Sequence, residues 1–322
     1  MRSPSLWVGA ILAGLLGLTV IAAPRLAPYD PDEQLDPAAA SYRPPGTELA
    51  AIHLTTGTWR LADRVERTPG GLRIERLGRT EELAADQVLN LTADGVADRR
   101  FYLVGSDKFG RDLWSRMLRG GQISLTIGLL AALVALVAGI AVGAAAALGG
   151  PWVDGFLMRS VDALLAIPSM LLFIAIAALF RPGTAGLVLL LAGGAWMTIS
   201  RLLRAEILSL KERDFILAAR ALGLHPFTIF RRHLLPNALT PVLTQTMLLI
   251  GQIILVESSL SFLGMGVQPP TATWGNLVAD GRESISYAWW IATFPGAAIS
   301  LAVIAFNLLG DGLRDVLDPR TR

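Results

Sequence analysis

Long apolar runs separated by short polar stretches dominate this 322-residue chain. A membrane-spanning helix needs roughly 20 apolar residues, because it rises about 1.5 Å per residue through a hydrocarbon core about 30 Å thick. Six segments meet this requirement and are predicted to span a membrane: residues 6–23, 123–148, 161–180, 186–203, 242–263 and 289–309. Asp162 and Pro168 lie in the opening turns of the third segment.

The composition agrees with this pattern. Hydrophobic residues make up 53% of the chain and charged residues only 17%, with a mean hydropathy of +0.52, which is too apolar for an ordinary soluble enzyme of this size. The formal net charge of +2 does not imply a basic surface for nucleic acid. The absence of cysteine excludes disulfides and thiolate metal sites.

The first apolar run has two interpretations. Arg2 precedes it and it ends in small residues, as in a cleaved signal peptide. However, Pro24 directly after Ala22 and Ala23 disfavours cleavage there, and the run is long for a signal core. We therefore expect an uncleaved anchor helix.

Basic residues in the short loops predict the orientation. The loop between the fourth and fifth segments is rich in arginine and lysine, whereas the flanking loops hold only Arg181 and Arg282. By the positive-inside rule the basic loop is cytoplasmic, so both termini lie inside and residues 24–119 lie outside.

Residues 24–100 differ from the rest in being rich in proline and in short apolar alternations. Two extended stretches, 51–61 and 72–77, flank Thr68-Pro69-Gly70-Gly71, which predicts a hairpin-like turn. A small β-containing subdomain is expected. A poorly ordered linker is the alternative, because few large apolar residues are present to form a core.

The stretch VGSDKFGRDLWSRMLRGGQISL, residues 104–125, predicts a glycine-punctuated turn followed by the start of an amphipathic helix. Asp112 suits the positive N-terminus of that helix. Arg111, Arg116 and Arg119 are spaced to form a polar stripe lying at the membrane interface. Trp274, Trp289 and Trp290 are typical of interfacial anchors.

The basic loop DFILAARALGLHPFTIFRRHLLPN predicts a helix over residues 206–222, a tight turn and a short second helix over 226–235. Gly223 suits the position after a helix end, and Pro226 suits a first helical turn. The second helix alternates apolar and basic residues, so it can insert into a groove of a partner or pack beneath its own membrane domain.

The spacing from Ala219 to Gly223 also resembles a DNA-binding helix-turn-helix. Membrane spans follow within a few residues at both ends of the loop, so neither helix can reach a major groove. We therefore expect no nucleic-acid partner.

This loop resembles the EAA loop of permease subunits of binding-protein-dependent ABC importers. The pattern of that loop is Glu-Ala-Ala, three residues, Gly, nine residues, Ile-x-Leu-Pro. Ala218, Ala219 and Gly223 match it, as does the closing Leu-Pro pair, whereas Leu217 replaces the glutamate and His233 the isoleucine. These two departures are similar to the dipeptide, oligopeptide and nickel branch.

Further stretches in the right order resemble the C-type subunit of that branch and cover most of residues 104–320. They are GSDKFGRDLWSRMLRGGQISL, VDGFLMRSVDALLAIPSMLL, ILVESSLSFLGMGVQPPTATWGNLV and FPGAAISLAVIAFNLLGDGLRDVLDPR. Residues 24–100 match no motif of the family.

The resemblance implies an all-α polytopic membrane protein with six transmembrane helices and the type I ABC importer permease fold, here with a small β-containing extracytoplasmic insert after the first helix. The expected parts are an anchor helix (1–23), an extracytoplasmic segment (24–103), a five-helix permease core (104–310) with a coupling loop (205–236), and a cytoplasmic tail (311–322).

The resemblance also implies partners. The chain is expected to form half of a translocation pathway for peptides or related solutes in a bacterial inner membrane. The expected partners are a homologous B-type permease, two ATP-binding subunits that hold ATP and Mg²⁺, an extracytoplasmic solute-binding protein and membrane lipid. The only lysines, Lys108 and Lys211, lie outside any phosphate-binding loop, so no ATPase site and no cofactor are expected in this chain.

Two sets of site residues are expected. The first set couples to the ATPase, through helix packing or direct contact: Ala218, Ala219, Gly223, His225, Pro226, Phe227, Phe230 and Arg231. The second set are candidates for the pathway or gate, because ionisable residues in spans are functional candidates by default: Glu257, Ser258 and Ser261. A hydrogen-bonded structural role is the alternative for Glu257. Asp162 is expected to cap a helix or to pair with Arg159.

A self-sufficient secondary transporter or channel is the main alternative function. Such a protein would be expected to show internal repeats and more polar residues at mid-membrane. A membrane enzyme is disfavoured because no H-E-x-x-H or G-x-S-x-G motif occurs and all histidines fall outside the spans. The sequence does not identify the solute.

Overall fold

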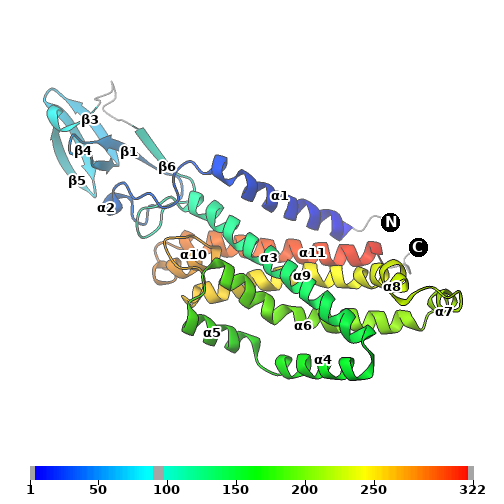
Figure 1. Ribbon diagram of the computed structural model, residues 1–322. Helices are drawn as coiled ribbons and strands as arrows, with labels where there is room; N and C mark the ends of the chain where they lie inside the picture. Colours follow the sequence, from blue (N-terminus) through cyan, green and yellow to red (C-terminus); the bar gives the residue numbers. More distant parts are fainter. Residues whose placement is uncertain (1–3, 90–97, 318–322) are drawn as a thin grey trace. The chain divides into compact units, whose positions relative to one another are not determined.

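The computed structural model describes residues 4–89 and 98–317. These residues belong to two compact units (Figure 1). The helical unit consists of Met1–Leu18, Ser124–Gln268 and Ile299–Arg322. The mixed unit consists of Thr19–Ile123 and Pro269–Ala298.

Seven long or moderately long helices carry the apolar runs. They are α1 (Pro4–Leu26), α3 (Leu113–Leu148), α4 (Gly150–Leu165), α5 (Ser169–Phe180), α6 (Thr184–Lys211), α9 (Leu235–Phe262) and α11 (Trp290–Leu317). Within the described residues, five helices are long and apolar enough to cross a membrane, and the bent pair α4 and α5 makes a sixth candidate span. The predicted number of six spans is reached when the bent pair is counted as one span.

The third span differs from its prediction as one segment over 161–180. The chain instead forms α4, which already begins at Gly150, and α5, and the two helices are bent by 77°. Pro168 lies at the break and immediately precedes α5. Proline has no N–H to donate and disfavours helical geometry in the residue before it, which explains why the helix ends here.

Small residues bring the helices of the helical unit close together. A Cβ atom on Gly139 would lie 2.6 Å from Ile199, and one on Gly143 would lie 2.6 Å from the carbonyl oxygen of Ser200. The two glycines are four residues apart on α3, so they form a single small-residue face against α6. Without a hydrophobic driving force in lipid, such close backbone approach is a main source of helix association.

Charged side chains tie α6 to its neighbours. Arg204 donates two hydrogen bonds to the carboxylate of Asp154 on α4, and the Nζ of Lys211 donates to the carbonyl oxygen of Ala147 at the end of α3. Asp162 lies 3.3 Å from the Nη1 of Arg201, so the expected pairing with Arg159 is wrong. Arg201 is on the adjacent helix α6, which the sequence alone does not place beside α4.

The mixed unit contains two antiparallel three-stranded sheets, which confirms the β-containing insert. The strand orders are β2-β1-β6 and β3-β4-β5. The elements are α2 (Pro37–Ala40), β1 (Thr47–His53), β2 (Trp59–Ala62), β3 (Arg64–Thr68), β4 (Gly71–Arg76), β5 (Arg79–Ala84), the 3₁₀ helix η1 (Ala85–Gln87), β6 (Asp98–Tyr102), α10 (Trp274–Gly281) and the 3₁₀ helix η3 (Arg282–Ser284).

The predicted turn is confirmed, but one of its flanking stretches is wrong. Thr68 pairs with Gly71, so the turn joins β3 to β4. The stretch 51–61 is not one strand, because it holds the end of β1, a turn and the start of β2. The sequence pattern missed β3, whose residues are mostly charged and exposed.

Strand β1 supplies both halves of a thin apolar core. Leu49 and Ala51 of β1 belong to one buried cluster, whereas Ile52 of β1 belongs to another, together with Leu54 just after the strand. Side chains alternate between the two faces of a strand, so a single strand serves both clusters. This arrangement gives a core to an insert that has few large apolar residues.

The glycine-rich turn before α3 forms as predicted. Gly105 and Gly110 have φ values of +90° and +74°, which favour glycine. The Oδ2 of Asp112 accepts a hydrogen bond from the backbone N–H of Ser115 at 2.8 Å, so Asp112 caps the first turn of α3. Burial raises the pKa of Asp112, whereas its hydrogen bonds from Ser115 oppose that rise.

The expected interfacial arginine stripe is wrong for Arg111 and Arg116, which are buried. The Nε of Arg111 lies 2.6 Å from the Oδ2 of Asp107, and the Nη1 of Arg116 lies 2.8 Å from the Oδ1 of Asp32. Paired arginines can be buried where single ones cannot, and one of these partners comes from far along the chain.

Two of the three expected tryptophan anchors are also buried. The Nε1 of Trp274 donates to the carbonyl oxygen of Met117 at 3.0 Å, and that of Trp290 donates to the carbonyl oxygen of Ser106 at 3.2 Å. Of these three tryptophans, Trp289 alone is substantially exposed. Trp274 and Trp290 therefore connect segments of the mixed unit that are far apart in the sequence.

Candidate coupling elbow and buried carboxylate cluster

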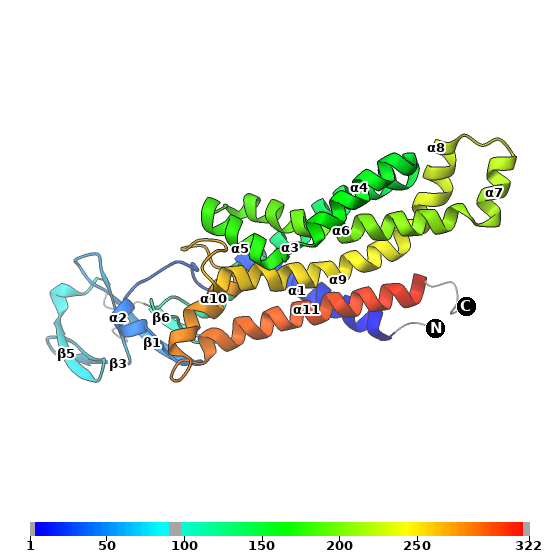
Figure 2. The same cartoon turned by 90° about the horizontal axis from the view of Figure 1, so that it is seen from below.

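Between α6 and α9 the chain forms a projecting elbow. It consists of α7 (Asp214–Ala221), a turn, α8 (Pro226–Ile229) and a single π-helical stretch, Phe230–Leu234. The predicted helix over 206–222 is interrupted, because α6 ends at Lys211 and α7 starts at Asp214. Within the helical unit, α7 and α8 reach beyond the ends of α4 and α11 (Figures 1 and 2).

The inner face of the elbow is apolar and packed. Ile216 and Ala219, three residues apart on α7, are buried, as are Ile229 on α8 and Leu234. Helices α7 and α8 contact each other, and α7 also contacts α6. The elbow therefore has its own small core and is attached to the helical unit.

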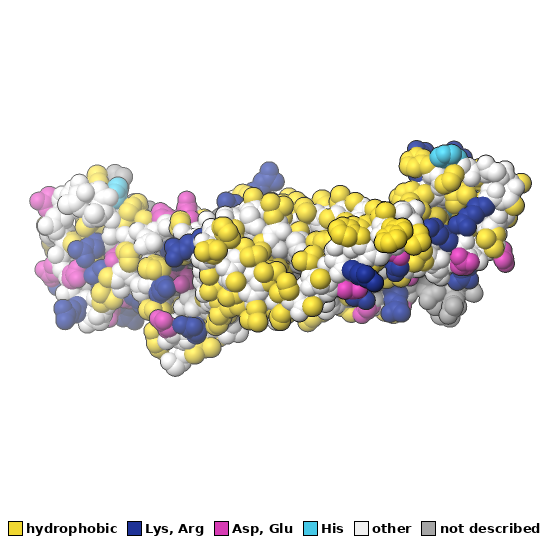
Figure 3. Space-filling model, turned by 60° about the horizontal axis from the view of Figure 1, so that its bottom comes forward, with side chains coloured by type: hydrophobic (Ala, Val, Ile, Leu, Met, Phe, Trp, Pro, Cys, Tyr) yellow, Lys and Arg dark blue, Asp and Glu magenta, His cyan; other side chains and the backbone are white. Residues whose placement is uncertain are grey.

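The outer face of the elbow is unusually apolar for an exposed loop. Leu222 is 82% exposed and Phe227 62% exposed, with Phe215, Leu217 and Leu224 also exposed. Basic side chains lie beside them on the surface: Arg213, Arg220, Arg231 and Arg232. Figure 3 shows apolar and basic side chains adjacent at this end of the helical unit. Such a surface has the chemistry to insert an aromatic ring into a groove with acidic surroundings.

The turn of the elbow depends on Gly223 and His225. Gly223 has φ of +75°, and its N–H donates to the carbonyl oxygen of Arg220 at 2.9 Å. The N–H of Leu224 donates to the carbonyl oxygen of Ala219 at 3.2 Å, which completes the helix end. His225 caps α8 by accepting a hydrogen bond at Nδ1 from the N–H of Phe227, at 3.3 Å.

The expected coupling residues all lie in this elbow, in different surroundings. Ala219 is buried, Phe230 is half-buried and the others are exposed: Ala218, Gly223, His225, Pro226, Phe227 and Arg231. A Cβ atom on Gly223 would meet nothing within 4 Å. The requirement for glycine there comes from the backbone angle, whereas close helix packing rests on Ala219.

The second set of expected residues forms a buried cluster around Glu257 on α9. Glu257 is 0% exposed. Its Oε1 accepts a hydrogen bond from the hydroxyl of Ser261 at 2.8 Å, and its Oε2 accepts one from Ser258 at 3.4 Å. The structure thus brings the three residues together.

Sequence reasoning missed a fourth member of this carboxylate cluster, Ser124 on α3. Its hydroxyl donates to the Oε2 of Glu257 at 3.2 Å, and Ser124 is fully buried. One turn further along α3, a Cβ on Gly128 would lie 2.7 Å from Ile254. The spacing of Ser124 and Gly128, both small and four residues apart, was the available signal for a close crossing of α3 and α9.

Comparison with known proteins shows the family. Residues 135–322 match the family model described as binding-protein-dependent transport system inner membrane component. The chain belongs to this family. The predicted identity as a permease subunit of an ABC importer is thereby confirmed, and the matched residues include the whole elbow and Glu257.

Curated members of the family are similar over about two thirds of the chain. A Brucella suis protein named as a peptide transport system permease is 46% identical over 224 residues, covering 69% of this chain and 74% of that protein. The dipeptide transport system permease protein DppC of Alkalihalophilus pseudofirmus is 41% identical over 218 residues, covering 68% and 72%.

Among solved structures, the fold is similar to a chain of the inward-facing MetNI methionine ABC transporter. The TM-score is 0.53 with 20% sequence identity, covering 63% of this chain and 96% of that chain. This similarity supports the permease fold of this chain.

Proposed function

We propose that this permease forms half of the translocation pathway of a bacterial importer for di- or oligopeptides or related small solutes. Relatives named as peptide and dipeptide permeases support this class of solute. The chain is a bacterial inner-membrane protein with both termini in the cytoplasm, and a homologous B-type permease completes the pathway. An extracytoplasmic binding protein delivers the solute.

The exposed apolar tip of the elbow carries the proposal. A loop that ends in Leu222 and Phe227, both largely exposed, leaves apolar surface that a protein partner would bury. Neither lysine lies in a phosphate-binding loop, so this chain has no conventional P-loop site of its own for ATP hydrolysis. We assign ATP and Mg²⁺ to two partner ATPase subunits, and the elbow to their contact with this chain.

In this mechanism the elbow transmits force and binds no nucleotide. Ala219 packs α7, Gly223 sets the turn, and Phe227 inserts into the ATPase while Arg231 contacts its surface. Closure of the two ATPase subunits then moves α6 and α9, to which the elbow is joined at both ends. The carboxylate cluster of Glu257, Ser258 and Ser261, with Ser124 from α3, is proposed to hold α3 and α9 together as part of the gate.

Phe227→Ala tests the proposed contact. Truncating an aromatic anchor at an interface typically costs 2 kcal/mol or more, so we expect roughly a 30-fold weaker association with the ATPase subunits. Co-purification and titration in detergent, with the permease pair held constant, measure this association.

Phe156→Ala is the matched control, because Phe156 is 74% exposed but lies on α4, outside the elbow. It should leave ATPase association unchanged. Equal effects of the two substitutions, or no association of the wild-type chain with any ATPase, would refute the proposed coupling. In the second case, solute movement by the purified chain down an ion gradient would instead support a secondary transporter.

A further inference from the structure

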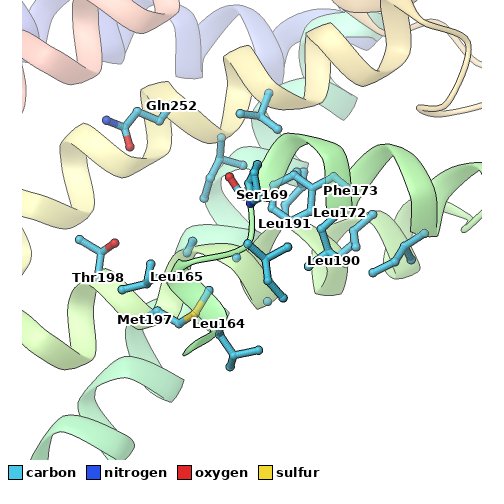
Figure 4. A pocket seen from close by; sticks show the side chains of 18 of the residues that line it. Leu164, Leu165, Ser169, Leu172, Phe173, Leu190, Leu191, Met197, Thr198 and Gln252 are labelled. Carbon is cyan, nitrogen blue, oxygen red and sulfur yellow. The ribbon is translucent and has the colours of Figure 1, made fainter. Parts of the chain in front are cut away.

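A cavity of about 660 Å³ opens in the helical unit beside the break between α4 and α5 (Figure 4). Its walls come from the end of α4, the linker, α5, α6 and α9. The volume falls in the range of roughly 300–1,000 Å³ that is typical of small-molecule sites. The cavity is therefore large enough for a solute such as a dipeptide.

The walls of this cavity are neutral. Most of its lining is aliphatic, and no ionisable side chain is among the described residues that line it. The polar side chains of the lining are Ser169, Thr198 and Gln252, one each from α5, α6 and α9. Three helices thus contribute one uncharged hydrogen-bonding group each to an otherwise apolar surface.

Gln252 is the most informative of these residues. It lies well inside the apolar helix α9 and is exposed, and its amide makes no hydrogen bond to the residues that the structure describes. On the same helix, Ser258 and Ser261 donate to Glu257. An amide facing hydrocarbon without a partner is costly, so Gln252 requires a polar occupant of the cavity or water.

We propose that this cavity is a solute-contact site of the pathway, in which Gln252 and Thr198 hydrogen-bond the backbone amides of a peptide. This inference rests on the proposed function. Uncharged hydrogen-bonding groups suit the amides of a peptide backbone, and the walls carry no charge that would favour an acidic over a basic side chain. Lipid tails cannot satisfy an amide, and helix contacts in this chain close tightly, as Gly139 against Ile199 does, without leaving such a cavity.

The test introduces a charge at Gln252. The full chain with its partner subunits is reconstituted in liposomes, and uptake of Ala-Glu is compared with uptake of Ala-Lys. Gln252→Lys should raise the ratio of the two rates by about tenfold, because a nearby cation favours an acidic solute and repels a basic one. Gln252→Asn, which keeps an amide, should retain the wild-type ratio.

Gln245→Lys is the matched control, since Gln245 lies one heptad earlier on α9 and does not line the cavity. It should leave the ratio unchanged. An unchanged ratio in Gln252→Lys, or an equal shift in both lysine variants, would overturn the site while leaving the proposed function intact. Absence of peptide uptake by the wild-type complex would overturn both.

Gln252→Leu tests whether Gln252 contacts the solute or the second permease. This variant is also used if the lysine variant does not assemble. We expect normal assembly with uptake of both dipeptides lowered together, at least about threefold, through loss of one hydrogen bond. Loss of assembly would instead make this surface a subunit interface and overturn the proposal, as would unaltered uptake.

Discussion

At the scale of single residues, the buried carboxylate of Glu257 is held by hydrogen bonds from two helices of the helical unit. It accepts hydrogen bonds from Ser124 on α3 and from Ser258 and Ser261 on its own helix. Removing the donors would leave a buried acceptor without a partner, and removing the carboxylate would leave buried hydroxyl groups without one. Either change costs free energy of folding. The cluster should therefore stabilise the crossing of α3 and α9.

A double-mutant cycle on Ser124→Ala and Glu257→Ala measures this link. We expect a coupling energy of about 0.5–3 kcal/mol in the free energy of unfolding of the purified chain, because the two side chains share one hydrogen bond. Ser259→Ala combined with Glu257→Ala is the control, since Ser259 donates to the carbonyl oxygen of Leu255 in its own helix. Additive effects for Ser124 and Glu257 would contradict the link.

A second residue-scale feature is the buried ion pair of Asp36 and Arg76 in the mixed unit. The Oδ1 of Asp36 lies 2.7 Å from the Nη2 of Arg76, and its Oδ2 accepts from the N–H of Leu61 at 3.0 Å. Burial by itself would raise the pKa of Asp36. The hydrogen bonds from Arg76 and Leu61 outweigh it, so the pKa of Asp36 lies below its usual value.

This lowered pKa predicts a pH dependence. The pair stabilises the fold above the unfolded-state pKa of about 3.9, and its contribution is lost as pH falls through the lower folded-state value. Hydrogen exchange of the Leu61 amide should be steady from pH 7 to 5 after correction for intrinsic rates, and protection should fall below about pH 4. Protection lost already near pH 6 would contradict this.

Asp36→Asn should destabilise the mixed unit by about 3–5 kcal/mol, because it leaves Arg76 buried without its counter-charge. Asp63→Asn is the control, because Asp63 pairs with Arg43 at 2.6 Å but is 33% exposed. An exposed pair is expected to contribute less than about 1 kcal/mol.

At the scale of elements, the turn between α7 and α8 decides how the elbow projects. Proline at position 223 cannot adopt the φ of +75° and has no N–H to donate to Arg220. Gly223→Pro should abolish solute uptake while ATP hydrolysis by the assembled complex continues. Gly223→Ala, which costs about 1–2 kcal/mol at this φ, should have a weaker effect.

Gly57→Pro is the control for backbone disruption itself, because Gly57 has φ of +81° in the turn between β1 and β2. It should leave the ratio of uptake to hydrolysis unchanged. Wild-type uptake by Gly223→Pro would count against a coupling role for the elbow.

Sequence reasoning predicted elements best where one local rule decides the structure. Apolar length located the spans, and Gly223 and Pro226 predicted the turn of the elbow and the start of α8. Predictions were wrong where a residue far along the chain determines the contact. Asp162 pairs with Arg201 on another helix, and the buried Arg116 pairs with Asp32, which lies far back in the chain.

The same holds for the candidate sites: residues close in sequence were predicted, whereas those brought together by the fold were missed. Ser258 and Ser261 are near Glu257 in sequence and were predicted with it, whereas Ser124 reaches the carboxylate only through the crossing of α3 and α9. Gln252 was missed because a single glutamine in an apolar run gives no sign of its exposure. The break at Pro168 was also missed, although the proline itself is visible in the apolar run.

At the scale of the whole molecule, the proposed transport cycle is divided between this chain and its partners. The helical unit supplies spans, an elbow and an uncharged cavity, and the elbow ends in apolar surface that a partner would bury. The β-strands of the mixed unit have their own small core. Transport should therefore depend on every partner at once.

Reconstitution in liposomes tests this claim most directly. The B-type permease, the ATPase subunits and the binding protein, encoded by neighbouring genes, are combined with and without this chain, and accumulation of a labelled dipeptide inside the liposomes is measured. We predict accumulation only when this chain, its partners and ATP are all present. Accumulation driven by an ion gradient with this chain alone, or ATP-driven accumulation without it, would contradict the account.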